Sequence, residues 1–173
     1  MRRVAEVAEV STAGIYIYFQ SKEAILAAIR DETFVELHAF ASKAIECASG
    51  PQDRLVRHLR AYLDYARDHP DTYRLTFRSQ LIRAPRPGRP SSPAEASGRE
   101  AFTALVADIA AAVDPQQHLD ADKAHAMAEA AWAAVHGMAS LVIDVPGFPA
   151  SGFDSAFGEL VHMVISGIRN RTG

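Results

Sequence analysis

The sequence predicts an all-α protein, with a helix-turn-helix head and a larger helical body. Apolar residues recur at helical spacing along nearly the whole chain, and segments with the alternation of a β-strand are almost absent. At 173 residues, the chain is long enough for a small head joined to one sizeable core. We expect the DNA-binding head to occupy residues 1–30 and the body to occupy residues 31–173.

The opening part of the chain predicts two short helices and one long one. The short helices are expected over residues 2–9 and 12–19. Ser21 is a good N-cap for the third helix, because its hydroxyl oxygen can accept from a free backbone N–H. This helix is expected to continue to about Ala48, since a glycine and a proline follow at 50–51.

The rest of the chain predicts five further helices. They are expected over residues 55–69, 72–81, 102–113, 120–144 and 153–168. The segment from Ala84 to Gly98 is rich in proline, glycine and serine, so it cannot bury enough apolar surface to offset its ordering entropy. We expect this segment to be a loop.

Composition excludes several classes of protein. Hydrophobic residues make up 49% and charged residues 23% of the chain, as in an ordinary soluble globular protein. A net charge of -3 excludes a generally basic nucleic-acid coat but leaves room for a local basic patch. The single cysteine, Cys47, cannot build a disulfide framework. We find no apolar run of membrane-spanning length and no signal peptide, and we expect a cytoplasmic protein.

The first two helices suggest a DNA-binding element. Two short helices joined by a tight polar turn are too small to hold a core, and their usual role is to place the second helix in a DNA major groove. The apolar joint between them is expected to comprise Val4, Val7, Val10, Ile15 and Phe19. Small residues let the helix approach the bases, while hydroxyl groups and cations suit phosphates. The predicted DNA contacts are Arg2, Arg3, Ser11, Thr12, Ala13, Gly14, Tyr16, Tyr18 and Lys22.

Three blocks of this head resemble the TetR/AcrR family of transcriptional regulators. They are VAEVAEVS from Val4, GIYIYF from Gly14 and SKEAIL from Ser21. In that family the middle block carries a tyrosine, then a tyrosine or histidine two places on, then phenylalanine, and a lysine follows at the start of the next helix. Those positions are held here by Tyr16, Tyr18, Phe19 and Lys22.

The resemblance implies a homodimer that binds a palindromic double-stranded DNA operator, most often as a repressor released by a small-molecule inducer. The family usually carries glycine where this chain has Glu9, in a left-handed cap that ends a helix. Retaining that conformation at Glu9 would cost on the order of 1 kcal/mol. The family also has a further helix before the motif, so we expect the head as given to be incomplete.

The body carries a second resemblance and a candidate ligand site. Residues 130–144 resemble the tryptophan–histidine–glycine signature of one TetR C-terminal domain class, at Trp132, His136 and Gly137. Aromatic walls with a few polar tips suit a mostly apolar ligand. The predicted ligand contacts are Tyr62, Tyr73, Phe77, Phe102, Trp132 and His136. The alternative is that these aromatic residues only fill the core.

The last two helices predict a dimer interface. The helix over 120–144 is apolar on two faces, so it should lie between its own domain and a second subunit. The final helix offers a long aliphatic stripe, and two such helices with their symmetry mates would form a four-helix interface. The predicted interface residues are Ala131, Ala134, Met138, Leu141, Phe157, Val161, Val164 and Ile168. The alternative is that both helices complete a monomeric core.

An enzyme or metal site is a weaker interpretation. Glu159 and His162 have the Glu-x-x-His spacing of di-metal helix bundles, and Asp122 with His125 is similar. However, Glu159 and His162 project away from the apolar stripe of their helix. We therefore expect no metal, no cofactor, no catalytic residue and no enzyme activity. The remaining alternative is a DNA-independent helical dimer that binds a small apolar ligand.

Overall fold

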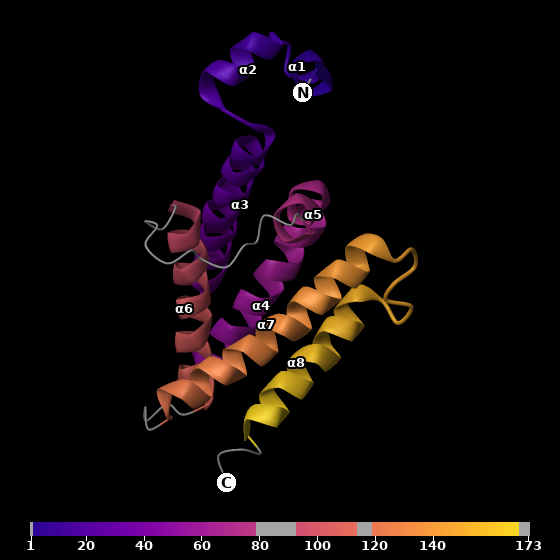
Figure 1. Cartoon of the computed structure of the whole chain (residues 1–173). Coiled ribbons are helices and arrows are strands. Elements are labelled where there is room, and N and C mark those ends of the chain that lie inside the picture. The colour runs from indigo at the N-terminus through magenta and orange to yellow at the C-terminus, as the bar shows by residue number, and fades with distance from the viewer. Residues whose placement is uncertain (1, 79–92, 114–118, 170–173) are drawn as a thin grey trace.

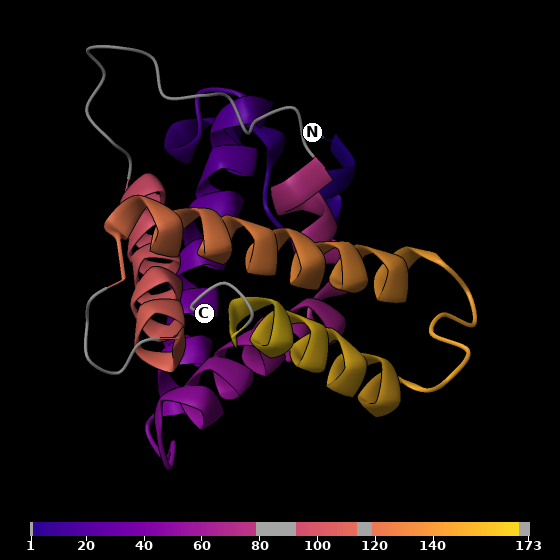
Figure 2. The ribbon, with the colours of Figure 1, turned by 90° about the horizontal axis from the view of Figure 1, so that it is seen from below.

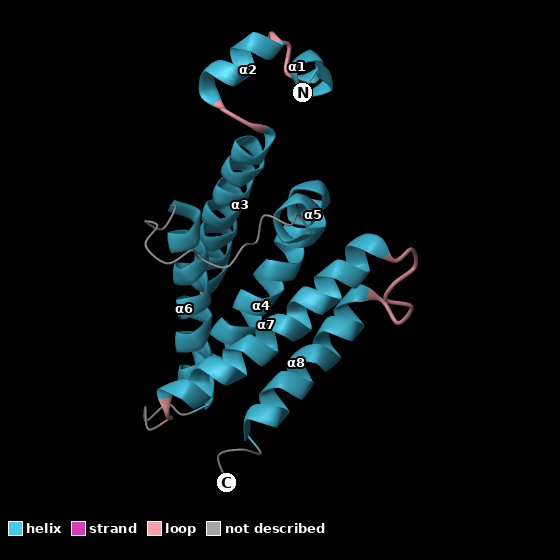
Figure 3. Cartoon of the chain, in the orientation of Figure 1, coloured by secondary structure: helices cyan, strands magenta, loops and turns pink. Residues whose placement is uncertain are grey.

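The computed structural model describes residues 2–78, 93–113 and 119–169. Within these ranges the chain forms eight helices and no strand, which confirms the all-α prediction (Figure 1 and Figure 3). The helices are α1 (Arg2–Val7), α2 (Thr12–Tyr18), α3 (Lys22–Ile45), α4 (Pro51–Asp68), α5 (Pro70–Arg78), α6 (Pro93–Val113), α7 (Ala121–Asp144) and α8 (Phe153–Arg169).

Helix α3 connects two parts of the molecule. Figure 1 shows α1 and α2 as a small head at the beginning of α3, while the rest of α3 runs into the body. In the body, α4 packs against α3, α6 and α7, and α6 also packs against α3. Figure 2 shows α8 alongside α7. The head is therefore joined to the body by one continuous helix.

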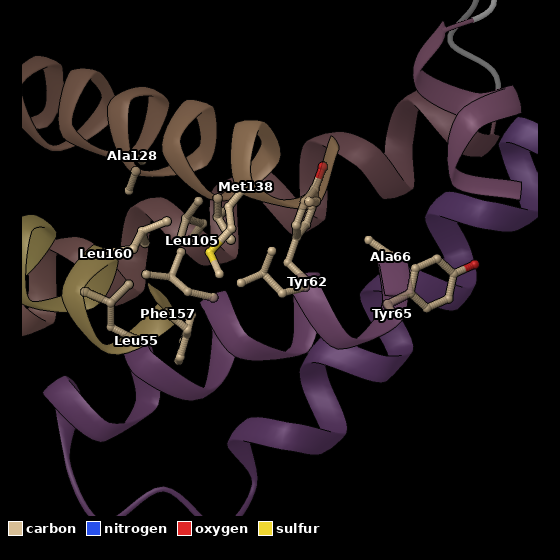
Figure 4. Close-up of a cluster of buried hydrophobic side chains, with 14 of the residues drawn as sticks. Leu55, Tyr62, Tyr65, Ala66, Leu105, Ala128, Met138, Phe157 and Leu160 are labelled. Carbon is tan, nitrogen blue, oxygen red and sulfur yellow. The ribbon is translucent and has the colours of Figure 1, made fainter. Parts of the chain in front are cut away.

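The core of the body is centred on α4. Leu55, Leu59, Tyr62 and Ala66 repeat at the spacing of one helical face and are all buried. Figure 4 shows Leu55 and Tyr62 of this face in one cluster with side chains of α6, α7 and α8, such as Leu105. Burial of a large apolar side chain contributes about 1.5–3 kcal/mol. The amphipathic pattern of α4 therefore fixes the position around which the other helices pack.

Proline residues begin three of the helices. Pro51, Pro70 and Pro93 are the first residues of α4, α5 and α6. Proline suits this position because its φ angle is already helical and the first turn needs no N–H from it. The prediction of a loop from Ala84 to Gly98 is therefore wrong for residues 93–98, which are helical. Residues 84–92 lie outside the described residues.

Helix α7 is unusually apolar. Among the described residues, it is long and apolar enough to cross a membrane, with a mean hydropathy of 1.4 over its best window. The expectation that no segment has the length and hydropathy of a membrane span is therefore corrected. A third of that window, 33%, is buried inside the chain. Because α7 packs against α4, α6 and α8, its apolar residues are those of a core helix that also has an uncovered face.

Candidate functional site

The head is held together by a smaller joint than the sequence predicts. Ala5 and Ile15 are its buried apolar residues, and Phe19 is half-buried. The valines predicted for this joint, Val4, Val7 and Val10, are exposed. Two helices of six and seven residues offer too little surface to cover them. The prediction for these valines is therefore corrected.

The beginning of α2 is built around Ser11. Its side-chain oxygen accepts from the Gly14 backbone N–H at 2.8 Å, so Ser11 is the N-cap. A β-carbon at Gly14 would lie 3.1 Å from that oxygen, which explains the small residue there. Thr12 and Gly14 are half-buried and Ala13 is exposed. The first turn of α2 therefore carries only small side chains.

The remaining predicted DNA contacts also lie on the surface of the head. Tyr16 is 48% exposed and Tyr18 is 82% exposed. Arg3 and Lys22 are exposed as well, Lys22 at the first position of α3. Arg2 belongs to α1, but its side chain lies outside the described residues. The body covers none of the described predicted contacts.

Glu9 has the left-handed backbone conformation that the resemblance implied, with a φ of 54°. We expect Glu9→Gly to raise the free energy of unfolding of the head by up to about 1 kcal/mol, because glycine adopts this conformation without a steric penalty. Amide hydrogen exchange of α1 and α2 would measure this change. Glu9→Ala removes the charge but keeps the strain, so an equal gain in Glu9→Ala would contradict this explanation.

The body contains a partly open cavity of about 550 Å³ between α3, α4, α5, α6 and α7. Four of the six predicted ligand contacts line it: Tyr62, Phe77, Phe102 and Trp132. Phe102 and Trp132 face each other edge to face at 6.1 Å between ring centroids. The lining is mostly apolar, as expected for a site that binds a largely apolar molecule.

The other two predicted contacts, Tyr73 and His136, lie behind the lining. The hydroxyl groups of Tyr62 and Tyr73 are 3.1 Å apart and lie 2.8 and 2.6 Å from His136 Nδ1. Burial raises the pKa of Tyr73 to about 12 and that of Tyr62 well above its ordinary value. Burial lowers the pKa of His136, which favours its neutral form. The tyrosines therefore keep their protons, and this network fixes the cavity wall.

Sequence reasoning missed several cavity residues. Arg30 and Phe34 of α3, His58 of α4 and Arg99 of α6 all line it. Phe34, Leu37 and Ala41 follow one another at helical spacing. That spacing indicates one apolar face of α3, but the sequence does not show which helix packs opposite this face.

A buried charged cluster lies at the edge of this cavity. Asp108 of α6 is 3% exposed and accepts hydrogen bonds from Arg54 Nε and, at 2.7 Å, from His58 Nδ1. Burial would raise the pKa of Asp108, but the hydrogen bonds from His58 and Arg54 outweigh it, and the pKa lies below its ordinary value. Asp108 therefore holds its negative charge and ties α6 to α4.

The predicted dimer residues fall into three groups. Ala131, Met138 and Phe157 are buried in the core of their own chain. Val161 and Val164 are half-buried against the same core, and the side chain of Ile168 lies outside the described residues. The two exposed members are Ala134 and Leu141.

The candidate metal pairs do not come together. Among the residues that the structure describes, no group of three or more His, Cys, Asp or Glu side chains is placed to hold a metal ion. His125 lies 3.6 Å from Glu129 of its own helix, and Glu159 and His162 are exposed on α8.

Both the head and the body of the chain match known protein families. Residues 1–29 match the family described as bacterial regulatory proteins, tetR family. Residues 55–165 match the family described as tetracyclin repressor-like, C-terminal domain. No curated protein matches the chain.

Two solved structures have a similar fold. A protein of unknown function from Rhodococcus sp. RHA1 is 25% identical, with a TM-score of 0.70 over 98% of this chain and 82% of that one. The candidate regulatory protein SCO4313 is 20% identical, with a TM-score of 0.69 over 95% of this chain and 84% of that one.

An exposed helix-turn-helix head on an all-helical body defines a DNA-binding transcriptional regulator. More particularly, the chain belongs to the TetR family of bacterial regulators. Proteins of this family are typically not enzymes; they bind operator DNA and generally act as ligand-responsive dimers.

Proposed function

We propose that this regulator is a cytoplasmic homodimeric repressor, which a small and mostly apolar molecule releases from a palindromic operator. The observation that carries the proposal is the apolar cavity of about 550 Å³, one wall of which is helix α3. The same helix begins at the head, with Lys22 as its first residue. One element therefore belongs both to the ligand site and to the DNA-binding part.

In the proposed complex, α2 lies in the major groove. Its small residues Thr12, Ala13 and Gly14 approach the base edges, while the tyrosine hydroxyls and the Lys22 ammonium contact phosphates. Ser11, Arg2 and Arg3 are further proposed contacts. In the dimer, two such helices would lie about 34–36 Å apart, one turn of DNA. Residues 1–30 would then form the head, and residues 31–173 the sensing and dimerisation domain.

The proposed dimer interface uses the face of α7 and α8 that the body leaves uncovered. Leu141 and Ala134 of α7 and Met163 of α8 are exposed apolar residues of these two helices. Small residues permit close approach of helices, and exposed apolar side chains on paired helices favour burial against a second copy. Val161, Val164 and Ile168 are proposed to border this interface.

Ligand release follows from a shift between two arrangements of the heads. A molecule in the cavity contacts α3 through side chains such as Phe34 and Leu37. If it binds best when α3 has the orientation that misaligns the two heads, it lowers the population competent for DNA. Phe77, Phe102, Trp132 and Tyr62 would form the rest of its site, with Tyr73 and His136 supporting the wall.

The DNA part of the proposal predicts a specific salt dependence. Tyr16→Phe and Lys22→Ala should each weaken binding to operator and non-operator DNA alike, by about tenfold, because both remove a phosphate contact. Lys22→Ala should also make the slope of log K against log salt shallower by about one unit. Fluorescence anisotropy with DNA from upstream of the protein's own gene measures both quantities.

Lys43→Ala is the matched control, because Lys43 is exposed at the far end of the same helix. Its DNA affinity and salt slope should equal those of the unaltered protein. If Lys22→Ala and Lys43→Ala behave alike, or if the protein shows no preference for any operator, the proposed docking is wrong.

A further inference from the structure

His58 differs from the other residues that line the cavity. Among the described lining residues, the buried side chains with polar atoms are His58, which is 9% exposed, and Tyr62. The Tyr62 hydroxyl already bonds Tyr73 and His136. The rest of the buried lining is aliphatic. His58 is thus a polar group set into an apolar wall.

The buried carboxylate of Asp108 fixes the tautomer of the His58 ring. A carboxylate can only accept, so Nδ1 of His58 must donate in the 2.7 Å hydrogen bond. In the neutral ring the other nitrogen, Nε2, then carries a lone pair and can accept. No described residue forms a hydrogen bond with Nε2. Asp108 is itself held by Arg54, which keeps the ring from turning.

We propose that His58 is the polar anchor of the ligand, and that the ligand is a mostly apolar molecule with one hydroxyl group, whose O–H donates to Nε2. This inference rests on the proposed ligand-sensing function and names the class of molecule. A phenol or an aliphatic alcohol satisfies it. The apolar part of the molecule would lie against Leu59, Phe102 and Trp132.

A carboxylate bound at His58 would face the negative charge of Asp108, although the cationic residues Arg30 and Arg99 also line the cavity. Asp108 lies within hydrogen-bonding distance of the same ring, and its negative charge would repel a second anion. The nearby guanidinium of Arg54 is already paired with Asp108. A neutral hydroxyl group brings no such repulsion and can donate to the Nε2 lone pair.

The experiment compares three probes of one shape: para-hexylphenol, its methyl ether and para-hexylbenzoate. Trp132 is the single tryptophan of the chain and lines the cavity, so its fluorescence reports binding there. We expect the phenol to bind about tenfold more tightly than the ether, as one buried hydrogen bond provides. The benzoate should bind more weakly than the phenol.

His58→Asn tests the role of Nε2 separately from packing. The asparagine amide can still donate to Asp108, so the buried pair is kept, but Nε2 is gone. We expect the phenol to lose its tenfold advantage while the affinity for the ether stays unchanged. His162→Asn is the control, because His162 is exposed on α8 and does not line the cavity, so it should not alter the preference.

Several results would overturn the inference. Equal binding of phenol and ether, or tighter binding of the benzoate than of the phenol, would overturn the proposed role of His58. The proposed ligand-sensing function would not be affected by either result. An equal loss of both affinities in His58→Asn would assign His58 a structural role only. If none of the probes changes the emission of Trp132, the inference fails, and the proposed function is then judged by operator binding and release.

Discussion

Asp108→Ala should lower the free energy of unfolding by about 3 kcal/mol. Removing one partner of a buried ion pair leaves the other charge or donor without compensation, which costs about 3–5 kcal/mol. We expect the lower end of this range, because the Arg54 side chain is 45% exposed and water can solvate it. His58, by contrast, would keep a buried donor with no described partner. Urea denaturation followed by circular dichroism measures the change.

The surface residue Asp64 provides the matched control for Asp108. It pairs with Arg60 on α4, where both side chains are partly exposed, so Asp64→Ala should cost less than about 1 kcal/mol. The pKa of Asp108 lies below its ordinary value in the folded protein. Its contribution should therefore be full at neutral pH and be lost as the pH falls below about 4. Equal effects of Asp108→Ala and Asp64→Ala would show that the cluster is not a buried pair.

Ala101→Trp should abolish the ligand response while leaving DNA binding intact. Ala101 lines the cavity from α6, so a large side chain there takes up space that a ligand would need. We expect the affinity for para-hexylphenol to fall by about 100-fold, or about 2.7 kcal/mol. Operator affinity should stay within a factor of about two, because Ala101 lies on α6 in the body and is none of the proposed DNA contacts. Calorimetry measures the first quantity, and anisotropy with operator DNA measures the second.

Ala107→Trp is the control for the bulk of the new side chain. Ala107 belongs to the same helix but is exposed, and it does not line the cavity. It should bind para-hexylphenol as the unaltered protein does. Unchanged phenol binding in Ala101→Trp would place the ligand site elsewhere, and a loss of operator affinity in Ala101→Trp alone would point to damaged folding.

Much of the fold follows from local sequence signals. The face of α4 could be predicted because Leu55, Leu59 and Ala66 repeat at helical spacing and the repeat is not interrupted. The cap at Ser21 could be predicted because capping depends on residues three positions apart, and Ser11 caps α2 in the same way. The start of α6 at Pro93 could not be predicted, because composition alone does not distinguish a proline that begins a helix from a proline in a loop.

The cavity was harder to predict than the head. Phe102 and Trp132, which the sequence predicts as ligand contacts, line the cavity. Whether a side chain lines the cavity depends on how its helix is rotated about its own axis. Tyr62 of α4 lines the cavity, whereas Tyr73 of α5 does not. The pairing of His58 with Asp108 joins residues 50 positions apart on different helices. No local pattern contains that information.

Because α3 both carries the head and lines the cavity, it could couple the proposed ligand and operator sites, and any such coupling would be reciprocal. If a ligand lowers operator affinity by some factor, thermodynamic linkage requires the operator to lower ligand affinity by the same factor. Operator-bound protein would then need a higher ligand concentration for occupancy than free protein does. Extra operator copies in a cell would raise the ligand threshold for induction, even though every cavity is chemically identical.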